Sequence, residues 1–297
     1  MHACMRIRFD RGTVVFDRAE AGVDLQKLVG AVWDDDLSAW RLPADQLSGA
    51  KARLSDAGIR ISDEVRPQRI AGEWLYPPLR WYQREAIDAW RDAGDRGVVA
   101  LPTGAGKTLV ALGAIERLGV ATLVIVPTRV LLDQWARVLA ACTSQPIGRL
   151  GDGDHQVLPI TIATYASAVG WAPRIGDRFG LVIVDEAHHV GAWCPGELFE
   201  MLVAPARLGL TATPPGDGGA LGRHVGPIVY ALSIADLVGD ALAEFDAVTI
   251  PIELAPAERL AYHNARATFA KAFGMFQRTT PDAPWREFGR ASCRERV

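Results

Sequence analysis

The sequence predicts an α/β domain with a parallel sheet, preceded by a smaller α+β domain. From residue 79 to about residue 230, short apolar runs alternate with helical patterns, which is typical of parallel strands covered on both faces. Before residue 66, apolar and polar residues alternate around tight turns, as they do in hairpins. The chain has 297 residues, of which 49% are hydrophobic, so it can form two or three domains with sizeable cores.

The predicted small domain spans 1–66 and begins with two hairpins. MRIRFDRGTVVFD alternates across an Asp-Arg-Gly turn, and AVWDDDLSAWRLP can form the second hairpin, with Trp33 and Trp40 building its core. ADQLSGAKARLSDAG then has helical spacing and ends at Gly58, and IRISDEV returns as a strand. The three prolines of RPQRIAGEWLYPP indicate a linker, which we place at 67–78.

The large domain begins with RWYQREAIDAWRDA, which has the spacing of an amphipathic helix. Five apolar runs after it predict the strands of the parallel sheet. They are GVVAL at 97–101, ATLVIV at 121–126, PITIA at 159–163, LVIV at 181–184 and RLGL at 207–210. Trp90 and Trp135 fall on helix faces, and we expect both to pack in the core.

A glycine-rich loop follows the first of these strands and opens a helix. Glycines let several backbone N–H groups turn toward one anion, and the N-terminus of a helix adds a favourable dipole. We expect Lys107 to reach the β- and γ-phosphates of ATP and the Thr108 hydroxyl to bind Mg²⁺. The residues of this predicted nucleotide-binding loop are Pro102, Thr103, Gly104, Ala105, Gly106, Lys107 and Thr108.

Two carboxylates, Asp185 and Glu186, follow the strand LVIV at the end where α/β sheets bind ligands. Asp185 can hold Mg²⁺ through water, and Glu186 can orient and deprotonate the attacking water. Taken alone, the pair is also consistent with two solvated carboxylates before a helix, where acidic side chains are favourable. Together with the phosphate loop, the pair predicts an ATP hydrolase.

Six segments occur in the order found in superfamily 2 helicases and translocases. They are LRWYQREAI, LPTGAGKT, IVPTRVLLDQW, TIATY, VIVDEAHH and LGLTATP. The set most resembles the XPB-like branch, and the front segment is similar to the damage-recognition-like domain that precedes the motor there. The resemblance implies a RecA-like P-loop domain at 79–232. It also implies that 233–297 is a connector toward a second RecA-like domain, which we expect to be truncated.

The resemblance also implies roles outside the phosphate loop. Gln83 is expected to recognise the adenine edge of ATP, since a side-chain amide both donates and accepts. The residues expected to contact a nucleic-acid backbone are Thr128, Arg129, Thr164 and Tyr165. The residues expected to couple the ATP site to that strand are His188, Thr211 and Thr213.

The chain departs from the family pattern in two places. XPB-like proteins carry an Arg-Glu-Asp element soon after the Thr-Ala-Thr motif, whereas TATPPGDGGALGRH retains only Asp217. This departure puts duplex unwinding in doubt, whereas ATP hydrolysis and translocation stay open. No second parallel α/β pattern follows residue 265. We expect a longer protein to supply a second motor domain with its arginine finger, and this chain alone to turn over ATP slowly.

The composition limits the classes of protein to which the chain can belong. The net charge of -3 means that the chain as a whole is not basic, so nucleic-acid binding must use local basic patches and backbone amides. Four scattered cysteines without a CxxC pair predict neither a zinc site nor a disulfide framework. No apolar run approaches the ~18 residues of a membrane span, so we expect a cytoplasmic protein at the bacterial nucleoid.

The leading hypothesis is an ATP-dependent DNA helicase or translocase motor with a role in DNA repair. A second hypothesis is the motor subunit of a restriction or defence system, which shares these motifs. A third is a nucleotide- or DNA-binding module without turnover. The motor motifs hold phosphates rather than bases, so RNA stays open as a partner.

Overall fold

The computed structural model describes residues 5–17, 23–215, 219–238 and 253–279. The chain divides into two compact units, residues 1–244 and residues 245–297. The first unit holds the two sheets. Among its described residues, the second unit holds the long helix α10 (Pro256–Thr279), whose side chains are exposed or half-buried. A search of the described helices finds no candidate membrane span.

The small sheet has five strands in the order β3-β4-β2-β1-β5. They are β1 (Met5–Asp10), β2 (Thr13–Asp17), β3 (Val32–Asp34), β4 (Ala39–Pro43) and β5 (Ile61–Asp63). Strands β1 and β2 form an antiparallel hairpin around Arg11 and Gly12, which both have positive φ. Strands β3 and β4 form the second hairpin, and β5 returns parallel to β1. Both predicted hairpins and the returning strand are confirmed.

Three short helical segments complete the small sheet's core: α1 (Leu25–Val29), η1 (Ala44–Gln46) and α2 (Leu47–Asp56). Helix α2 ends just before Gly58, whose φ of +72° is the left-handed conformation expected after a helix. Helix α1 was not predicted, because five residues carry too little periodicity to be recognised.

The tryptophans of the second hairpin differ in their surroundings. Trp40 packs against the core of the small sheet, as expected. Trp33 is 46% exposed, so the prediction that it builds this core is wrong. It lies on the edge strand β3, packs edge-on against Trp40 at a ring separation of 5.4 Å, and donates its indole N–H to Asp35.

The large sheet has eight strands in the order β13-β6-β12-β11-β7-β10-β8-β9. They are β6 (Arg96–Ala100), β7 (Thr122–Val126), β8 (Ile147–Gly151), β9 (Asp154–Gln156), β10 (Ile160–Thr164), β11 (Leu181–Asp185), β12 (Ala206–Thr211) and β13 (Ile228–Ala231). All pairings are parallel except that of β9 with β8. The five predicted strands are confirmed as the contiguous centre of the sheet, and the α/β fold class is confirmed with them.

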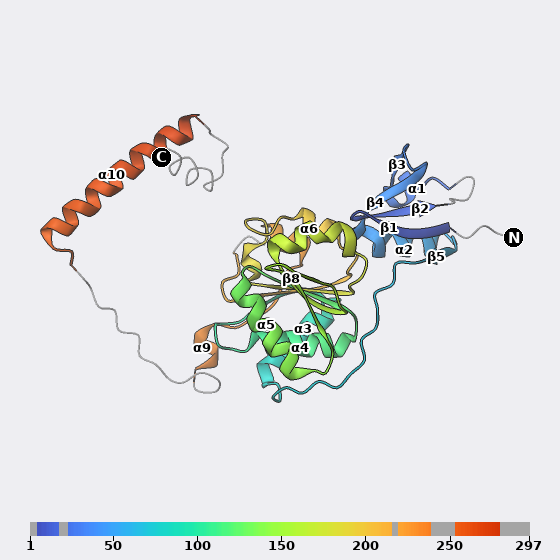
Figure 1. Cartoon of the computed structure of the whole chain (residues 1–297), viewed down its shortest axis with the longest axis horizontal. Helices are drawn as coiled ribbons and strands as arrows, with labels where there is room; N and C mark the ends of the chain where they lie inside the picture. Colours follow the sequence, from blue (N-terminus) through green and yellow to red (C-terminus); the bar gives the residue numbers. More distant parts are fainter. Residues whose placement is uncertain (1–4, 18–22, 216–218, 239–252, 280–297) are drawn as a thin grey trace. The chain divides into compact units, whose positions relative to one another are not determined.

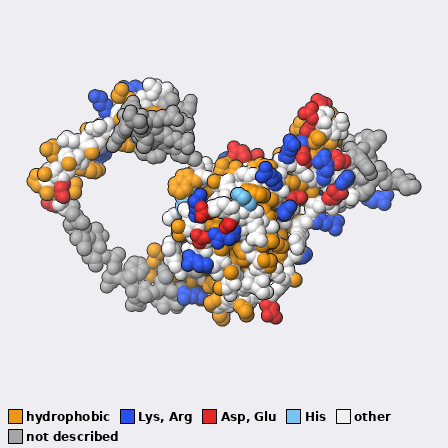
Figure 2. Space-filling view, viewed as in Figure 1, with side chains coloured by type: hydrophobic (Ala, Val, Ile, Leu, Met, Phe, Trp, Pro, Cys, Tyr) orange, Lys and Arg blue, Asp and Glu red, His pale blue; other side chains and the backbone are white. Residues whose placement is uncertain are grey.

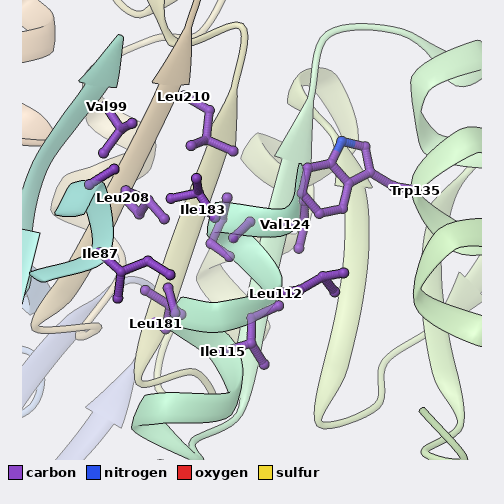
Figure 3. Close-up of a cluster of buried hydrophobic side chains, with 14 of the residues drawn as sticks. Ile87, Val99, Leu112, Ile115, Val124, Trp135, Leu181, Ile183, Leu208 and Leu210 are labelled. Carbon is purple, nitrogen blue, oxygen red and sulfur yellow. The ribbon is translucent and has the colours of Figure 1, made fainter. Parts of the chain in front are cut away.

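Helices cover both faces of this sheet (Figure 1). One face carries α3 (Trp81–Asp92), α4 (Lys107–Leu118), α5 (Arg129–Cys142) and α9 (Ile234–Leu237). The other carries α6 (Tyr165–Ile175), η2 (Ala187–His189), α7 (Glu197–Glu200) and α8 (Gly219–His224). Each face of the sheet has its own hydrophobic core, and successive strand residues point to opposite faces. Val124 and Ile183 face α4 (Figure 3), whereas Leu123 and Val182 pack in the core on the other face.

The predicted linker, residues 67–78, is bound along the large domain in an extended conformation. Its backbone N–H groups reach the ends of two helices: Ile70 donates to the Gly119 carbonyl at 3.0 Å, and Leu75 donates to the Cys142 carbonyl at 2.7 Å. Carbonyls at helix C-termini lack intrahelical partners, so these bonds satisfy them. Ile70, Trp74 and Tyr76 also pack against the core. We call residues 67–78 the strap.

Charged side chains are mixed by sign on the surface. On the face shown in Figure 2, described Lys and Arg side chains are interspersed with Asp and Glu. This agrees with the small net charge of the chain. Any anion site on this face therefore has to be built from local groups, and the parallel strands place those groups at one edge of the sheet.

Candidate active site

The phosphate loop connects β6 to α4 at the carboxyl edge of the sheet. Gly104 and Gly106 have φ of +82° and +78°, which L-residues with a side chain rarely adopt. Gly106 is the N-cap of α4 and offers no side chain to its first N–H groups. A Cβ atom on Gly106 would lie 2.5 Å from the Gln83 side-chain nitrogen. The loop is thus compact and directs a helix N-terminus outward, as a phosphate site requires.

Lys107 lies over this loop. Its Nζ donates to the carbonyls of Leu101 at 3.1 Å and Pro102 at 3.3 Å. Partial burial lowers the pKa of Lys107, and the nearby Glu186 and Asp185 carboxylates oppose that shift. The predicted lysine and the two predicted carboxylates are therefore close enough to interact electrostatically.

Asp185 ends β11 and is only 8% exposed. Its Oδ1 accepts the Glu186 backbone N–H at 3.0 Å, and its Oδ2 accepts the Trp135 indole N–H at 2.8 Å. Glu186 has φ of +50°, an uncommon conformation for a non-glycine residue. Its carbonyl accepts the His189 N–H at 3.0 Å, which helps to hold this conformation. Such local strain is typical of functional sites.

The three predicted coupling residues are brought together beside Glu186. His188 Nδ1 lies 3.0 Å from Thr211 Oγ1 and 3.4 Å from Glu186 Oε2. Thr211 is fully buried, and its Oγ1 also accepts the Thr213 N–H at 3.1 Å. A continuous set of hydrogen-bonding groups thus runs from Glu186 to the end of β12. Its coupling role stays a prediction.

Gln83 joins the start of α3 to the phosphate loop. Its side-chain nitrogen donates to the Ala105 carbonyl at 2.9 Å, and its oxygen accepts the Arg80 N–H at 2.9 Å. The Tyr82 hydroxyl donates to the same Ala105 carbonyl at 3.0 Å. A primary amide has a second N–H and a second lone pair, so these bonds leave capacity for an adenine edge. Adenine recognition stays a prediction.

Two family models match the chain in sequence. Residues 7–65 match the model of the Xeroderma pigmentosum group B helicase damage recognition domain. Residues 77–216 match the model described as Type III restriction enzyme, res subunit. The first match covers most of the small sheet. The second covers the phosphate loop and the four residues Asp185, Glu186, Ala187 and His188, which we call the DEAH segment.

Curated relatives extend over both domains. The DNA 3'-5' translocase XPB2 of Sulfurisphaera tokodaii is 32% identical over 266 residues, which cover 88% of this chain and 58% of the relative. The chain is similar in sequence to XPB-type DNA translocases and helicases over both of its domains. The DNA 3'-5' helicase XPB of Mycobacterium tuberculosis is 32% identical over 277 residues, covering 87% of this chain and 46% of the relative. The chain therefore spans about half the length of these XPB-type relatives.

Three of the four predicted nucleic-acid residues lie at the same sheet edge as the phosphate loop. Thr128 and Thr164 are the N-caps of α5 and α6, where their hydroxyls accept the N–H groups of Leu131 and Ser167. Arg129 is 70% exposed and forms an ion pair with Asp152. All three sit at the ends of β7 and β10, which are neighbouring strands. Asp217 and residues 239–252 and 280–297 lie outside the described residues.

Tyr165, the fourth predicted nucleic-acid residue, is directed inward. Its side chain is 4% exposed, and its hydroxyl donates to the carbonyls of Asp185 at 2.5 Å and Glu186 at 3.1 Å. Burial raises the pKa of this phenol, so it stays protonated as a donor. This placement favours support of the DEAH segment over contact with a nucleic-acid strand.

Sequence reasoning missed one residue at this site. Trp135 packs in the core, as expected, but its indole N–H also donates to Asp185. The only available signal was its position on the helix that follows Thr128, and spacing alone does not say which atom an indole reaches.

The donor set fits ATP with Mg²⁺. Within the described part of the chain, no three His, Cys, Asp or Glu side chains gather into a preformed metal site. Mg²⁺ is commonly held by one or two protein oxygens together with substrate phosphates, and the Thr108 hydroxyl and the Asp185 carboxylate supply such oxygens. The uncapped start of α4 and Lys107 supply the positive groups for the phosphates.

Proposed function

We propose that this chain provides the first RecA-like domain of an ATP-dependent DNA helicase or translocase of the XPB type. One observation carries the proposal: the phosphate loop, the Asp185–Glu186 pair and the His188–Thr211 contact meet at one edge of a parallel sheet. The small N-terminal domain supports it, because its family model is that of a helicase damage recognition domain.

Each residue has a role that follows from its position. Lys107 and the first N–H groups of α4 bind the ATP phosphates. Thr108 and Asp185 hold Mg²⁺, which neutralises charge that develops on the phosphates. Glu186 orients the attacking water and accepts its proton. Gln83 recognises adenine, and the His188, Thr211 and Thr213 set transmits the state of the site to the nucleic-acid strand.

DNA is the partner that we propose. The names of the curated relatives specify DNA. Thr128, Arg129 and Thr164 offer hydroxyl and guanidinium groups for backbone phosphates at the strand ends beside the ATP site. A second RecA-like domain would complete the site. RNA stays open, since phosphate contacts carry no base information.

A restriction-type motor is the second candidate. The family model over residues 77–216 carries that description, so the motor region alone does not separate the two. The match of residues 7–65 favours the XPB type. If a nuclease or methyltransferase domain were found joined to this chain, the restriction-type motor would be the better proposal.

The test is nucleotide binding by this chain, followed by ATP hydrolysis by this chain and by a chain extended with a second RecA-like domain. Binding of a fluorescent ATP analogue with Mg²⁺ should be measurable, and Lys107→Ala should weaken it at least tenfold. Lys27→Ala removes the same charge from an exposed position in the small domain and serves as the control. We expect slow turnover by this chain and DNA-stimulated turnover once a second RecA-like domain is present. The proposal is wrong if Lys107→Ala binds the analogue with the same affinity as wild type.

A further inference from the structure

We propose that Trp135 is a positioning residue for the Asp185 carboxylate, and that its indole N–H fixes the orientation in which Asp185 binds Mg²⁺. This inference rests on the proposed function of the site. It adds a residue of α5 to the residues that we propose to act on Mg²⁺ and the phosphates, which follow β6 and β11.

The contact is direct and buried. The indole nitrogen lies 2.8 Å from Asp185 Oδ2, and the Trp135 side chain is 2% exposed. The ring packs beside Val124 and near Leu112, which hold it on the sheet face (Figure 3). Because an indole N–H can only donate, it has one function toward a carboxylate: to stabilise the ionised form in one orientation.

The carboxylate has two fixed bonds that differ in origin. The bond from the Glu186 N–H to Oδ1 joins neighbouring residues at the strand end and fixes one oxygen. The bond from Trp135 comes from a helix 50 residues away and fixes the second oxygen. With both bonds in place, the plane of the carboxylate is determined. Groups that hydrogen-bond to a metal ligand typically change metal affinity 10–100-fold when they are removed.

The decisive variant is Trp135→Phe, which removes the N–H and keeps an aromatic ring in the core. Binding of a fluorescent ATP analogue is titrated with Mg²⁺ and is also measured in excess EDTA. We expect the Mg²⁺ midpoint to rise about tenfold, while the affinity in EDTA stays within twofold of wild type. A purely structural role would lower both affinities together.

Trp90→Phe is the matched control. Trp90 is fully buried, and its indole N–H donates to the Arg207 carbonyl at 2.9 Å, away from the phosphate loop. The two variants thus lose the same kind of bond from the same kind of side chain. Trp90→Phe should leave the Mg²⁺ midpoint unchanged.

Several outcomes separate this inference from the proposed function. If wild type binds the analogue with Mg²⁺ dependence and folded Trp135→Phe keeps the same midpoint, the inference is overturned. If wild type shows no Mg²⁺-dependent binding, the proposed function fails first. Should Trp135→Phe not fold, indole ¹⁵N–¹H spectra decide: Asp185→Asn and Mg²⁺·ATP must each shift the same indole resonance. A spectrum in which no indole resonance responds to both overturns the inference.

Discussion

The hydroxyl of Tyr165 donates to two consecutive carbonyls of the DEAH segment, those of Asp185 and Glu186. The first of these residues carries the proposed metal ligand, and the second adopts a left-handed conformation. A single buried donor therefore supports both backbone positions. At the scale of single residues, the candidate site depends on side chains that contact its backbone as well as on those that we propose to bind the nucleotide.

Tyr165→Phe should lower the free energy of unfolding by about 1–2 kcal/mol, because it removes a buried hydrogen bond and leaves carbonyls with fewer partners. Urea denaturation measures this. Tyr230→Phe is the control, since the Tyr230 hydroxyl donates to the exposed Glu85 side chain at 2.9 Å. If Tyr165→Phe instead loses DNA affinity without losing stability, a direct nucleic-acid contact is the better account.

Some site residues could be predicted from the sequence and others could not, for a physical reason. Lys107, Asp185 and Glu186 belong to short local patterns whose chemistry is complete within a few residues. Trp135 and Tyr165 act on Asp185 from helices that lie 50 and 20 residues away in the chain. Their contribution depends on which side-chain atoms contact Asp185 in the folded domain. The local periodicity of the sequence does not contain that information.

At the scale of elements, the starts of α5 and α6 combine a helix cap with a proposed DNA contact. Thr128 and Thr164 cap these helices and also lie at the proposed DNA edge. A side-chain cap satisfies an N–H group that has no helical partner. The same threonines can therefore be needed for stability, for DNA binding, or for both, and substitutions must separate the two.

Thr128→Ala should cost about 1 kcal/mol of stability, because the bond from the Leu131 N–H to the Thr128 hydroxyl is lost. Thr128→Ser keeps the hydroxyl and should keep the stability. Thermal or urea unfolding compares the three proteins. Equal stabilities of the alanine and serine variants would contradict the capping role.

The elements that the sequence predicted are those with the simplest patterns. The central strands, such as β7 and β11, are wholly buried and contain continuous apolar runs. Strand β8 contains two glycines and an arginine, β9 is DHQ with all residues exposed, and β13 has no fully buried residue. These outer strands pair because the sheet offers them an edge, and their own residues carry little signal.

At the scale of the whole chain, the strap changes where we draw the limit of the large domain. Its N–H groups complete the C-terminal ends of α4 and α5, and Ile70, Trp74 and Tyr76 join the core. We propose that residues 67–78, predicted as a linker, belong to the motor domain in structural terms. The remaining limits, 1–66, 79–232 and 233–297, stay proposals.

Two N-terminal deletions test this limit. A protein that starts at residue 67 should retain the urea midpoint of the large domain, whereas one that starts at residue 79 should be several kcal/mol less stable, since it loses buried apolar side chains and two helix-end hydrogen bonds. Replacing 68–76 with Gly and Ser at equal length controls for chain length. Equal midpoints for the two deletions would show that the strap is only a tether.

The bound strap has a consequence for exchanging domains between relatives. A front domain joined by a free tether could be swapped at any point along that tether. Here, the carbonyls of Gly119 and Cys142 and the backbone of Ala121 are matched to particular strap residues. A working chimera should therefore take its strap from the same parent as its large domain, with the crossover placed between Val65 and Pro67.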